Sequence, residues 1–192
     1  MSKKLYEKMN LYLANQEVAY IKLHNLHWYV KGRSFFTLHA KLEELYDQTA
    51  EIIDAVAERL LAVGQAPVAN MKEALALATI KELADKPISS EETVQGLIAD
   101  VEYWIRDTKE IVELADAAGD GVTADQFNDY LGEYQNCCGC SNPTLPETER
   151  INCNPRCHKA AGVFLCPQIN FADKHFFDTS LCYIDCRQVR TL

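Results

Sequence analysis

All eight cysteines of this 192-residue chain lie after residue 135, and this one feature divides the sequence into two parts. Residues 136–192 also hold four of the six prolines, with five acidic and six basic side chains. Residues 1–135 contain no cysteine and carry 23 acidic against 13 basic side chains. We therefore predict two units, a folded domain over 1–135 and a small cysteine-rich module of unknown fold over 136–192.

The first part shows the apolar spacing of amphipathic helices. Apolar side chains recur at intervals of three and four residues from Leu5 to Leu23, which predicts a first long helix. A break around Gly32 separates it from a second helix over 35–63. Gly64 is a typical residue for the end of that second helix, because glycine readily adopts the left-handed conformation found there.

Two capping-box sequences predict two further helices. Ser89 is followed three residues later by Glu92 and opens a third long helix. Thr123 is followed by Gln126 and opens a fourth helix that ends near residue 135. The fourth helix would have about 13 residues and a length of roughly 20 Å, too short to cover its neighbours.

The connection between the second and third helices has room for one short helix within 69–83. No alternating strand pattern occurs before residue 150. The predicted fold class is therefore all-α, a four-helix bundle of the ferritin-like connectivity with a short crossover helix, followed by the cysteine-rich module.

Four side chains of the second helix share one stripe: His39, Glu43, Asp54 and Glu58. At 100° per residue, the three acids lie about 40°, 60° and 100° round from the histidine. The inner members, Glu43 and Asp54, stand roughly 16 Å apart along the axis, so one metal ion cannot bridge them. Two antiparallel copies related by a two-fold axis would bring the pairs together. The spacing predicts an intersubunit site, and the alternative is that these acids are solvated surface side chains.

His27 lies twelve residues before His39 and could face it across the turn between the first two helices. Imidazole and carboxylate ligands together suit iron, zinc or manganese, and open coordination positions would leave room for an oxidant. The alternative is that His24 and His27 are ordinary capping or core histidines.

Three segments with fixed gaps resemble the Dps miniferritins, the DNA-binding proteins from starved cells: 22–32, 35–39 and 54–61. The resemblance covers about residues 4–135. It implies a dodecameric cage of four-helix subunits that oxidises Fe(II), preferably with hydrogen peroxide, and stores ferric mineral inside. The ferroxidase site of that family lies between two subunits.

The resemblance also implies a role for each residue of the stripe. His27, His39 and Glu43 from one chain would bind iron together with Asp54 and Glu58 from its mate, and no organic cofactor is expected. The family usually has Asp where this chain has Glu43. Two ferrous ions would supply both electrons that peroxide needs, so hydroxyl radical would not be released.

Three further residues take candidate roles from the resemblance. Trp28 would intercept stray oxidising equivalents beside the site, unless it is only a packed aromatic side chain. The pores through which iron enters such cages lie near the start of the fourth helix, where Asp120 and Asp125 are the candidates. Either could equally be a helix-start carboxylate that interacts with the helix dipole.

The net charge of -9 and the pI near 5.0 do not favour nucleic-acid phosphates as partners. Only Lys3, Lys4 and Lys8 offer positive charge near the start, so DNA binding is an alternative that is not favoured. No run approaches the roughly 18 apolar residues that cross a bilayer, and the beginning lacks a signal-peptide pattern. We expect a cytoplasmic homo-oligomer without a membrane partner.

The cysteine-rich module leaves three interpretations open. Its cysteines are Cys137, Cys138, Cys140, Cys153, Cys157, Cys166, Cys182 and Cys186. They could form disulfides, bind a metal as thiolates, or belong to an appendage without an evolved function. Two alternative functions follow for the whole chain, a cage that displays this module or a DNA-protecting nucleoid protein.

Overall fold

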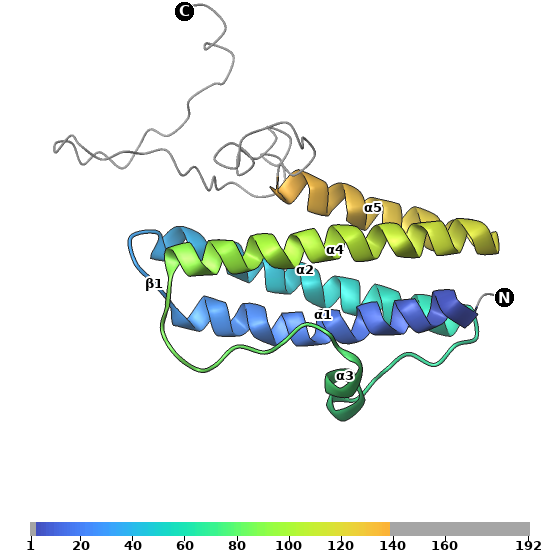
Figure 1. Ribbon diagram of the computed structural model, residues 1–192, viewed down its shortest axis with the longest axis horizontal. Helices are drawn as coiled ribbons and strands as arrows, with labels where there is room; N and C mark the ends of the chain where they lie inside the picture. Colours follow the sequence, from blue (N-terminus) through green and yellow to red (C-terminus); the bar gives the residue numbers. More distant parts are fainter. Residues whose placement is uncertain (1–2, 139–192) are drawn as a thin grey trace, which may run out of the picture.

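The computed structural model describes residues 3–138, which form five helices and two very short strands. In chain order these are α1 (Lys3–Tyr29), β1 (Val30–Lys31), α2 (Phe35–Ala62), α3 (Met71–Leu77), β2 (Ile88–Ser89), α4 (Ser90–Ala118) and α5 (Gly121–Cys138). Figure 1 shows α1, α2, α4 and α5 lying lengthwise beside one another, with α3 outside the bundle. The all-α, ferritin-like bundle with a short crossover helix is confirmed.

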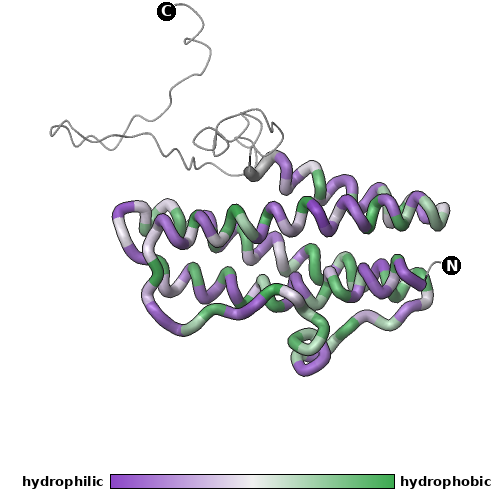
Figure 2. The backbone as a smooth tube through the Cα atoms, viewed as in Figure 1, coloured by the Kyte–Doolittle hydropathy of each residue, from purple (hydrophilic) through white to green (hydrophobic). Residues whose placement is uncertain are grey.

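The core of the bundle is built around aromatic rings. Tyr12 is fully buried, and its ring makes edge contacts with Trp104 and Phe127 at centroid distances of 5.4 and 5.1 Å. Leu60 and Ile111 belong to the same buried cluster. Figure 2 shows apolar and polar residues interleaved along each long helix, as expected where one side of a helix packs inward. None of the helices within 3–138 has the length and apolar character that crossing a bilayer requires.

Two predicted helix ends are confirmed. Ser89 caps α4, because its hydroxyl accepts the backbone N–H of Glu92 at 3.1 Å, and the carboxylate of Glu92 accepts the backbone N–H of Ser89 at 3.1 Å. At the end of α2, Gly64 has a positive φ of 76° and donates its N–H to the carbonyl of Leu61. This left-handed conformation is why glycine suits the position.

The predicted capping box at the start of α5 is wrong. The helix begins at Gly121, and Asp120 caps it by accepting the backbone N–H of Thr123 at 3.2 Å and the Thr123 hydroxyl at 2.6 Å. Gln126 donates its side-chain amide to the hydroxyl of Tyr130 instead. Aspartate is at least as good a cap as threonine, so the earlier residue takes the role.

Helix α5 is also longer than predicted. It has 18 residues and continues to Cys138, beyond the boundary expected at 135, but remains shorter than α1, α2 and α4 with 27, 28 and 29 residues. Cys137 and Cys138 form its last residues. The other six cysteines lie outside the described residues: Cys140, Cys153, Cys157, Cys166, Cys182 and Cys186.

The connection from α2 to α4 is held against the bundle by Asn15 of α1, which is fully buried. Its carbonyl oxygen accepts the backbone N–H groups of Thr79 at 2.8 Å and Ile80 at 3.0 Å, and its amide donates to the Tyr103 hydroxyl at 2.8 Å. Helix α3 has 7 residues and is shorter than the range 69–83 in which we expected it.

The two strands were not predicted. Val30 pairs with Ile88 and Lys31 with Ser89 in parallel, which ties the end of α1 to the start of α4. A pairing of two residues is too short to give an alternating pattern, so the sequence carries no signal for it.

Candidate metal centre

His27 near the end of α1 and His39 near the start of α2 form a reciprocal pair. Their rings stack with centroids 3.5 Å apart and an interplanar angle of 21°. Nδ1 of His27 lies 2.8 Å from the carbonyl oxygen of His39, and Nδ1 of His39 lies 2.9 Å from the carbonyl oxygen of His27. A carbonyl oxygen only accepts, so each Nδ1 donates a hydrogen. The neutral ring then keeps a free lone pair on Nε2, the form that binds a metal.

Aromatic side chains hold this pair in place. Phe35 stacks on His39 at a centroid distance of 5.0 Å, and Tyr46 sets its ring edge against His27 at 5.4 Å. His24 stacks on Tyr46 at 3.9 Å. His27 is only 8% exposed, so its ring orientation is fixed by packing as well as by its hydrogen bond. Nε2 of each ring makes no hydrogen bond within residues 3–138, so this nitrogen of both rings is open to a ligand.

Trp28 differs from the buried aromatic residues around it. Its side chain is 67% exposed, and its ring contacts His24 at a centroid distance of 5.3 Å. Within the single chain Trp28 therefore does not belong to the core, and its two candidate roles stay predictions. Trp28 lies at the surface, and the rings of His24 and Tyr46 lie between it and His27.

The three acids of the stripe are all exposed on α2. Burial raises the pKa of the Tyr46 hydroxyl, and so do the negative charges of Glu43 and Asp47 and a hydrogen bond with Glu43. Asp54 and Glu58 lie more than four turns beyond His39 on the same helix. Within residues 3–138 no three His, Cys, Asp or Glu side chains gather closely enough to hold a metal ion. One chain brings the two histidines together and leaves these two acids apart from them.

The two candidate pore acids differ in their surroundings. Asp120 forms an ion pair with Arg59 at 2.6 Å and also accepts the hydrogen bonds from Thr123. Burial alone would raise the pKa of the Asp120 carboxyl, but the Thr123 hydrogen bonds and the Arg59 charge lower it below its usual range. Both of its oxygens are therefore occupied, as the helix-start alternative expects. Asp125 is exposed in the second turn of α5.

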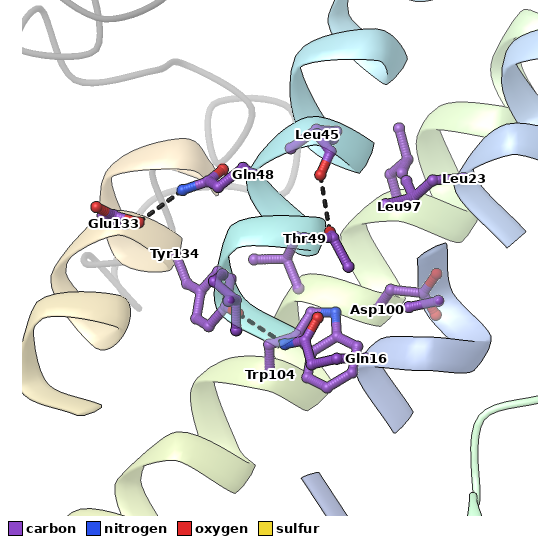
Figure 3. Close-up of a pocket in the computed structure, with 13 residues that line it drawn as sticks. Gln16, Leu23, Leu45, Gln48, Thr49, Leu97, Asp100, Trp104, Glu133 and Tyr134 are labelled. Atoms are coloured by element: carbon purple, nitrogen blue, oxygen red, sulfur yellow. Dashed lines mark hydrogen bonds between the residues drawn. The ribbon is translucent and has the colours of Figure 1, made fainter. Parts of the chain in front are cut away.

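The sequence analysis missed a polar network inside the bundle. A cavity of about 50 Å³ lies between α1, α2, α4 and α5 (Figure 3). Beside it Gln16 donates to the Tyr134 hydroxyl at 2.9 Å, and Gln48 donates to Glu133 at 2.6 Å. Such a volume can hold water. The signal in the sequence was Gln16, a polar residue that recurs at the apolar spacing of α1.

The carboxylates at this cavity already have partners. Asp100, which lines it, forms an ion pair with Lys22 at 2.6 Å, and Glu133 accepts the amide of Gln48. The remaining lining is mostly apolar. The interior cavity is therefore a poor place for a metal, and the histidine pair at the edge of the bundle is the better candidate.

Comparison with known proteins agrees with this fold. The sequence model of the ferritin-like domain matches residues 6–136. General stress protein 20U of Bacillus subtilis is 48% identical over 136 residues, which are 71% of this chain and 91% of that protein. DNA protection during starvation protein 2 of Bacillus anthracis is 44% identical over 134 residues, 70% of this chain and 89% of that protein.

Solved structures show the same similarity. Dps from Staphylococcus aureus superimposes with a TM-score of 0.67 at 40% identity, covering 70% of this chain and 89% of that one. The bundle and the matched domain define the class, a ferritin-like protein. Within that class the chain belongs to the Dps miniferritin family. Iron storage or DNA protection is the work of this family. The matched domain ends at residue 136 and leaves most of the cysteine-rich part outside it.

Proposed function

We propose that this protein oxidises Fe(II) at sites shared by two subunits, with hydrogen peroxide or oxygen as the oxidant, and stores the ferric product inside a dodecameric cage. The observation that carries the proposal is the reciprocal pair of His27 and His39. Its hydrogen bonds engage Nδ1 of both rings, so Nε2 is the nitrogen that each ring can offer to a metal, and the chain holds two imidazole ligands in place.

The remaining ligands come from carboxylates. Glu43 lies one turn beyond His39 on the same helix face, and the partner subunit's Asp54 and the partner subunit's Glu58 would complete the site across a two-fold axis. Imidazole suits Fe(II), whereas carboxylate oxygen favours the harder Fe(III). A mixed set therefore binds the substrate ion and also favours its oxidation.

The stoichiometry favours a site for two ferrous ions. Hydrogen peroxide takes up two electrons and two protons to give two water molecules, and each ferrous ion supplies one electron as it becomes ferric. One ion alone would supply one electron and release hydroxyl radical. A site that holds both ions together avoids that product.

The first experiment mixes the purified protein with Fe(II) and hydrogen peroxide in the absence of oxygen and follows the ferric absorbance by stopped flow. His39→Ala and Asp54→Ala should each lower the rate at least about tenfold, because each removes a metal ligand. Glu113→Gln removes an exposed carboxylate from α4 and serves as the matched control with an unchanged rate. Equal rates for all four proteins would overturn the proposal.

A second experiment tests whether the site is shared. His39→Ala chains and Asp54→Ala chains are mixed and allowed to exchange subunits. A mixed dimer contains one site in which both defects fall together and one site in which neither does. Random mixing should therefore restore about a quarter of the wild-type sites. A site built within one chain would show no recovery, and this outcome would exclude the intersubunit arrangement.

A further inference from the structure

Helix α5 covers only part of the bundle. The ring of Tyr134 stacks on Trp104 at a centroid distance of 6.4 Å, so α5 is level with Trp104 four residues before it ends at Cys138. Helix α4 begins at Ser90, so about ten residues at its start, roughly 15 Å of helix, lie beyond the end of α5. Figure 1 shows α2 and α4 continuing past this point. Within residues 3–138 this end of the bundle therefore has three long helices instead of four.

Leu97 shows the consequence for packing. At 100° per residue it lies about 20° round α4 from Trp104, at the same angle as Ala115. Trp104 and Ala115 are 5% and 0% exposed, whereas Leu97 on the same face is only partly buried. Helix α4 has no buried residue between Thr93 and Trp104. The face of α4 that forms the core beneath α5 therefore stays partly open beyond it.

Four partly exposed apolar residues lie on this side of the bundle, and we call them the open groove: Leu45 of α2 with Val94, Leu97 and Val101 of α4. Leu45, Val94 and Leu97 pack against a buried cluster that includes Leu42. Leu45, Leu97 and Val101 also line the cavity of about 50 Å³ (Figure 3). An apolar surface that continues into a cavity indicates that another segment covers it.

The charged side chains at the open groove are acidic. Asp100 and Glu133 line the cavity, and among the described residues its lining contains no base. Lys22 pairs with Asp100 at 2.6 Å, whereas Glu133 is exposed and accepts the amide of Gln48. A segment that complements this groove should therefore be apolar and carry positive charge beside its apolar residues.

The sequence that follows α5 contains one segment with this chemistry. The longest apolar run within 139–192 is 160–166. It follows Arg156 and Lys159, and no acid occurs from 150 to 172. Two other runs with large apolar side chains, 176–177 and 181–184, are flanked by aspartates instead: Asp173, Asp178 and Asp185. Charge complementarity therefore favours the run 160–166.

The connecting chain is long enough for this contact. The 21 residues 139–159 separate α5 from the run. An extended chain spans about 3.3 Å per residue, so these residues reach up to roughly 70 Å. The open groove begins where α5 ends and is roughly 15 Å long. The tether also gives the run a high effective concentration at the groove of its own chain.

We propose that residues 160–166 cover the open groove of the same chain and pack Phe164 against Leu45 and Leu97. The basic residues before the run then lie beside Glu133. The run takes the place beside α4 that α5 leaves open, and this gives the apolar part of the cysteine-rich module a role in closing the bundle. The proposal does not depend on iron oxidation.

Photocrosslinking of the full chain identifies what covers the groove. Benzoylphenylalanine replaces Leu97, or Leu45 in a second protein, and this isotopically light chain is refolded with an excess of heavy wild-type chain and irradiated. After reduction and tryptic digestion, the expected product joins the photoreactive residue to light peptide 160–174, which ends before the runs 176–177 and 181–184. Val122 is 64% exposed near the start of α5, and benzoylphenylalanine at this control position should not give the product.

Three results of the crosslinking would reject the proposal. A product on heavy peptide 160–174 would show that the run of a second copy covers the groove. A product on peptide 175–187 would show that a different segment of the chain does so. Reaction with solvent alone, at both groove positions, would show that the groove stays open.

Limited trypsin cleavage after Lys159 measures how strongly the run is held, because the protease must bind the residues on both sides of the bond. Phe164→Ala should speed this cleavage at least about tenfold, since loss of a buried ring increases the fraction of released chains. Leu97→Ala should speed it from the other side of the contact, and circular dichroism confirms that this variant is folded. Phe176→Ala is the matched control with an unchanged rate. Equal rates for Phe164→Ala and wild type, or equal acceleration by Phe176→Ala, would overturn the proposal.

Discussion

Two pairs of polar rings in this protein, Tyr12 with Tyr134 and His27 with His39, show opposite uses of hydrogen bonds within one bundle. The tyrosine hydroxyls lie 2.7 Å apart, and Gln16 donates to Tyr134 at 2.9 Å. Burial is the main cause that raises the pKa of both hydroxyls well above the usual range. Each tyrosine oxygen finds its partner inside the chain.

The histidine pair uses only half of its hydrogen-bonding groups in this way. One nitrogen of each ring donates to the backbone, and the other faces away from those bonds. The difference teaches a working rule for this fold. A polar pair stabilises the bundle when all of its polar atoms form hydrogen bonds within the chain. A polar pair can bind a ligand when hydrogen bonds to one atom of each ring orient another atom that has no partner.

The largest expected change in the free energy of unfolding comes from a core side chain and not from the histidine pair. Phe127→Ala should lower the free energy of unfolding by about 3–5 kcal/mol, because it removes a fully buried ring that packs against Tyr12. Chemical denaturation at fixed protein concentration measures the loss. Iron oxidation well below the unfolding transition should persist.

His39→Ala is the matched comparison for this prediction. It should remove iron oxidation while changing the free energy of unfolding far less than Phe127→Ala does. Equal losses of stability in the two variants would show that the histidine pair is part of the core and would remove the distinction.

The next largest effect concerns Asn15, a buried side chain whose amide forms its hydrogen bonds within the chain. Asn15→Ala should lower the free energy of unfolding by about 2–3 kcal/mol, because it removes a fully buried side chain whose oxygen accepts the backbone N–H groups of Thr79 and Ile80. Hydrogen exchange followed by mass spectrometry should show faster exchange in the connection from α2 to α4. Unchanged exchange there would mean that α3 is held by its apolar contacts alone.

How far the sequence predicts these features depends on how local they are. The cap of α4 at Ser89 and the end of α2 at Gly64 rest on residues within one turn, and both were predicted. The cap of α5 was not, because the choice of Asp120 over Thr123 involves Arg59, which lies 61 residues away in the chain. The stripe of α2 was visible from spacing, as was the chance that His27 faces His39.

The orientation of the two histidine rings was beyond the sequence. It depends on the distance and angle between α1 and α2, which many side chains set together. The interior network of Tyr12, Gln16 and Tyr134 was missed for the same reason, since its members lie on α1 and α5, more than a hundred residues apart.

A smaller effect tests the interior pair itself. Tyr134→Phe should lower the free energy of unfolding by about 1–2 kcal/mol, because the ring still packs but Tyr12 and Gln16 lose a partner. Iron oxidation should stay at the wild-type rate, measured by the same stopped-flow assay. Tyr130→Phe, at a half-buried hydroxyl that accepts one bond from Gln126, is the control with a smaller loss. A slower oxidation in Tyr134→Phe would show that the interior network communicates with the site.

The smallest effect concerns Asp120. Both of its carboxylate oxygens have partners within the chain, as the hydroxyls of Tyr12 and Tyr134 do. Asp120→Asn keeps a good helix cap and removes the charge facing Arg59, so it should lower the free energy of unfolding by about 0.5–1 kcal/mol at neutral pH. The pKa of this carboxyl is lower in the folded protein than in the unfolded chain. Its contribution is therefore present above the unfolded pKa and is lost as the pH falls through the folded one.

The difference between wild type and Asp120→Asn should accordingly be constant near neutral pH and disappear on acidification below about pH 4. Thermal unfolding over a pH series measures it, and a difference that did not change with pH would contradict the ion pair as its source. The rate of iron uptake gives the second comparison. If Asp120 serves only the start of α5, Asp120→Asn leaves the rate of iron uptake unchanged. Asp125 is exposed about one turn further along α5. If α5 lines the pore, Asp125→Asn removes a negative charge from the pore and slows iron uptake.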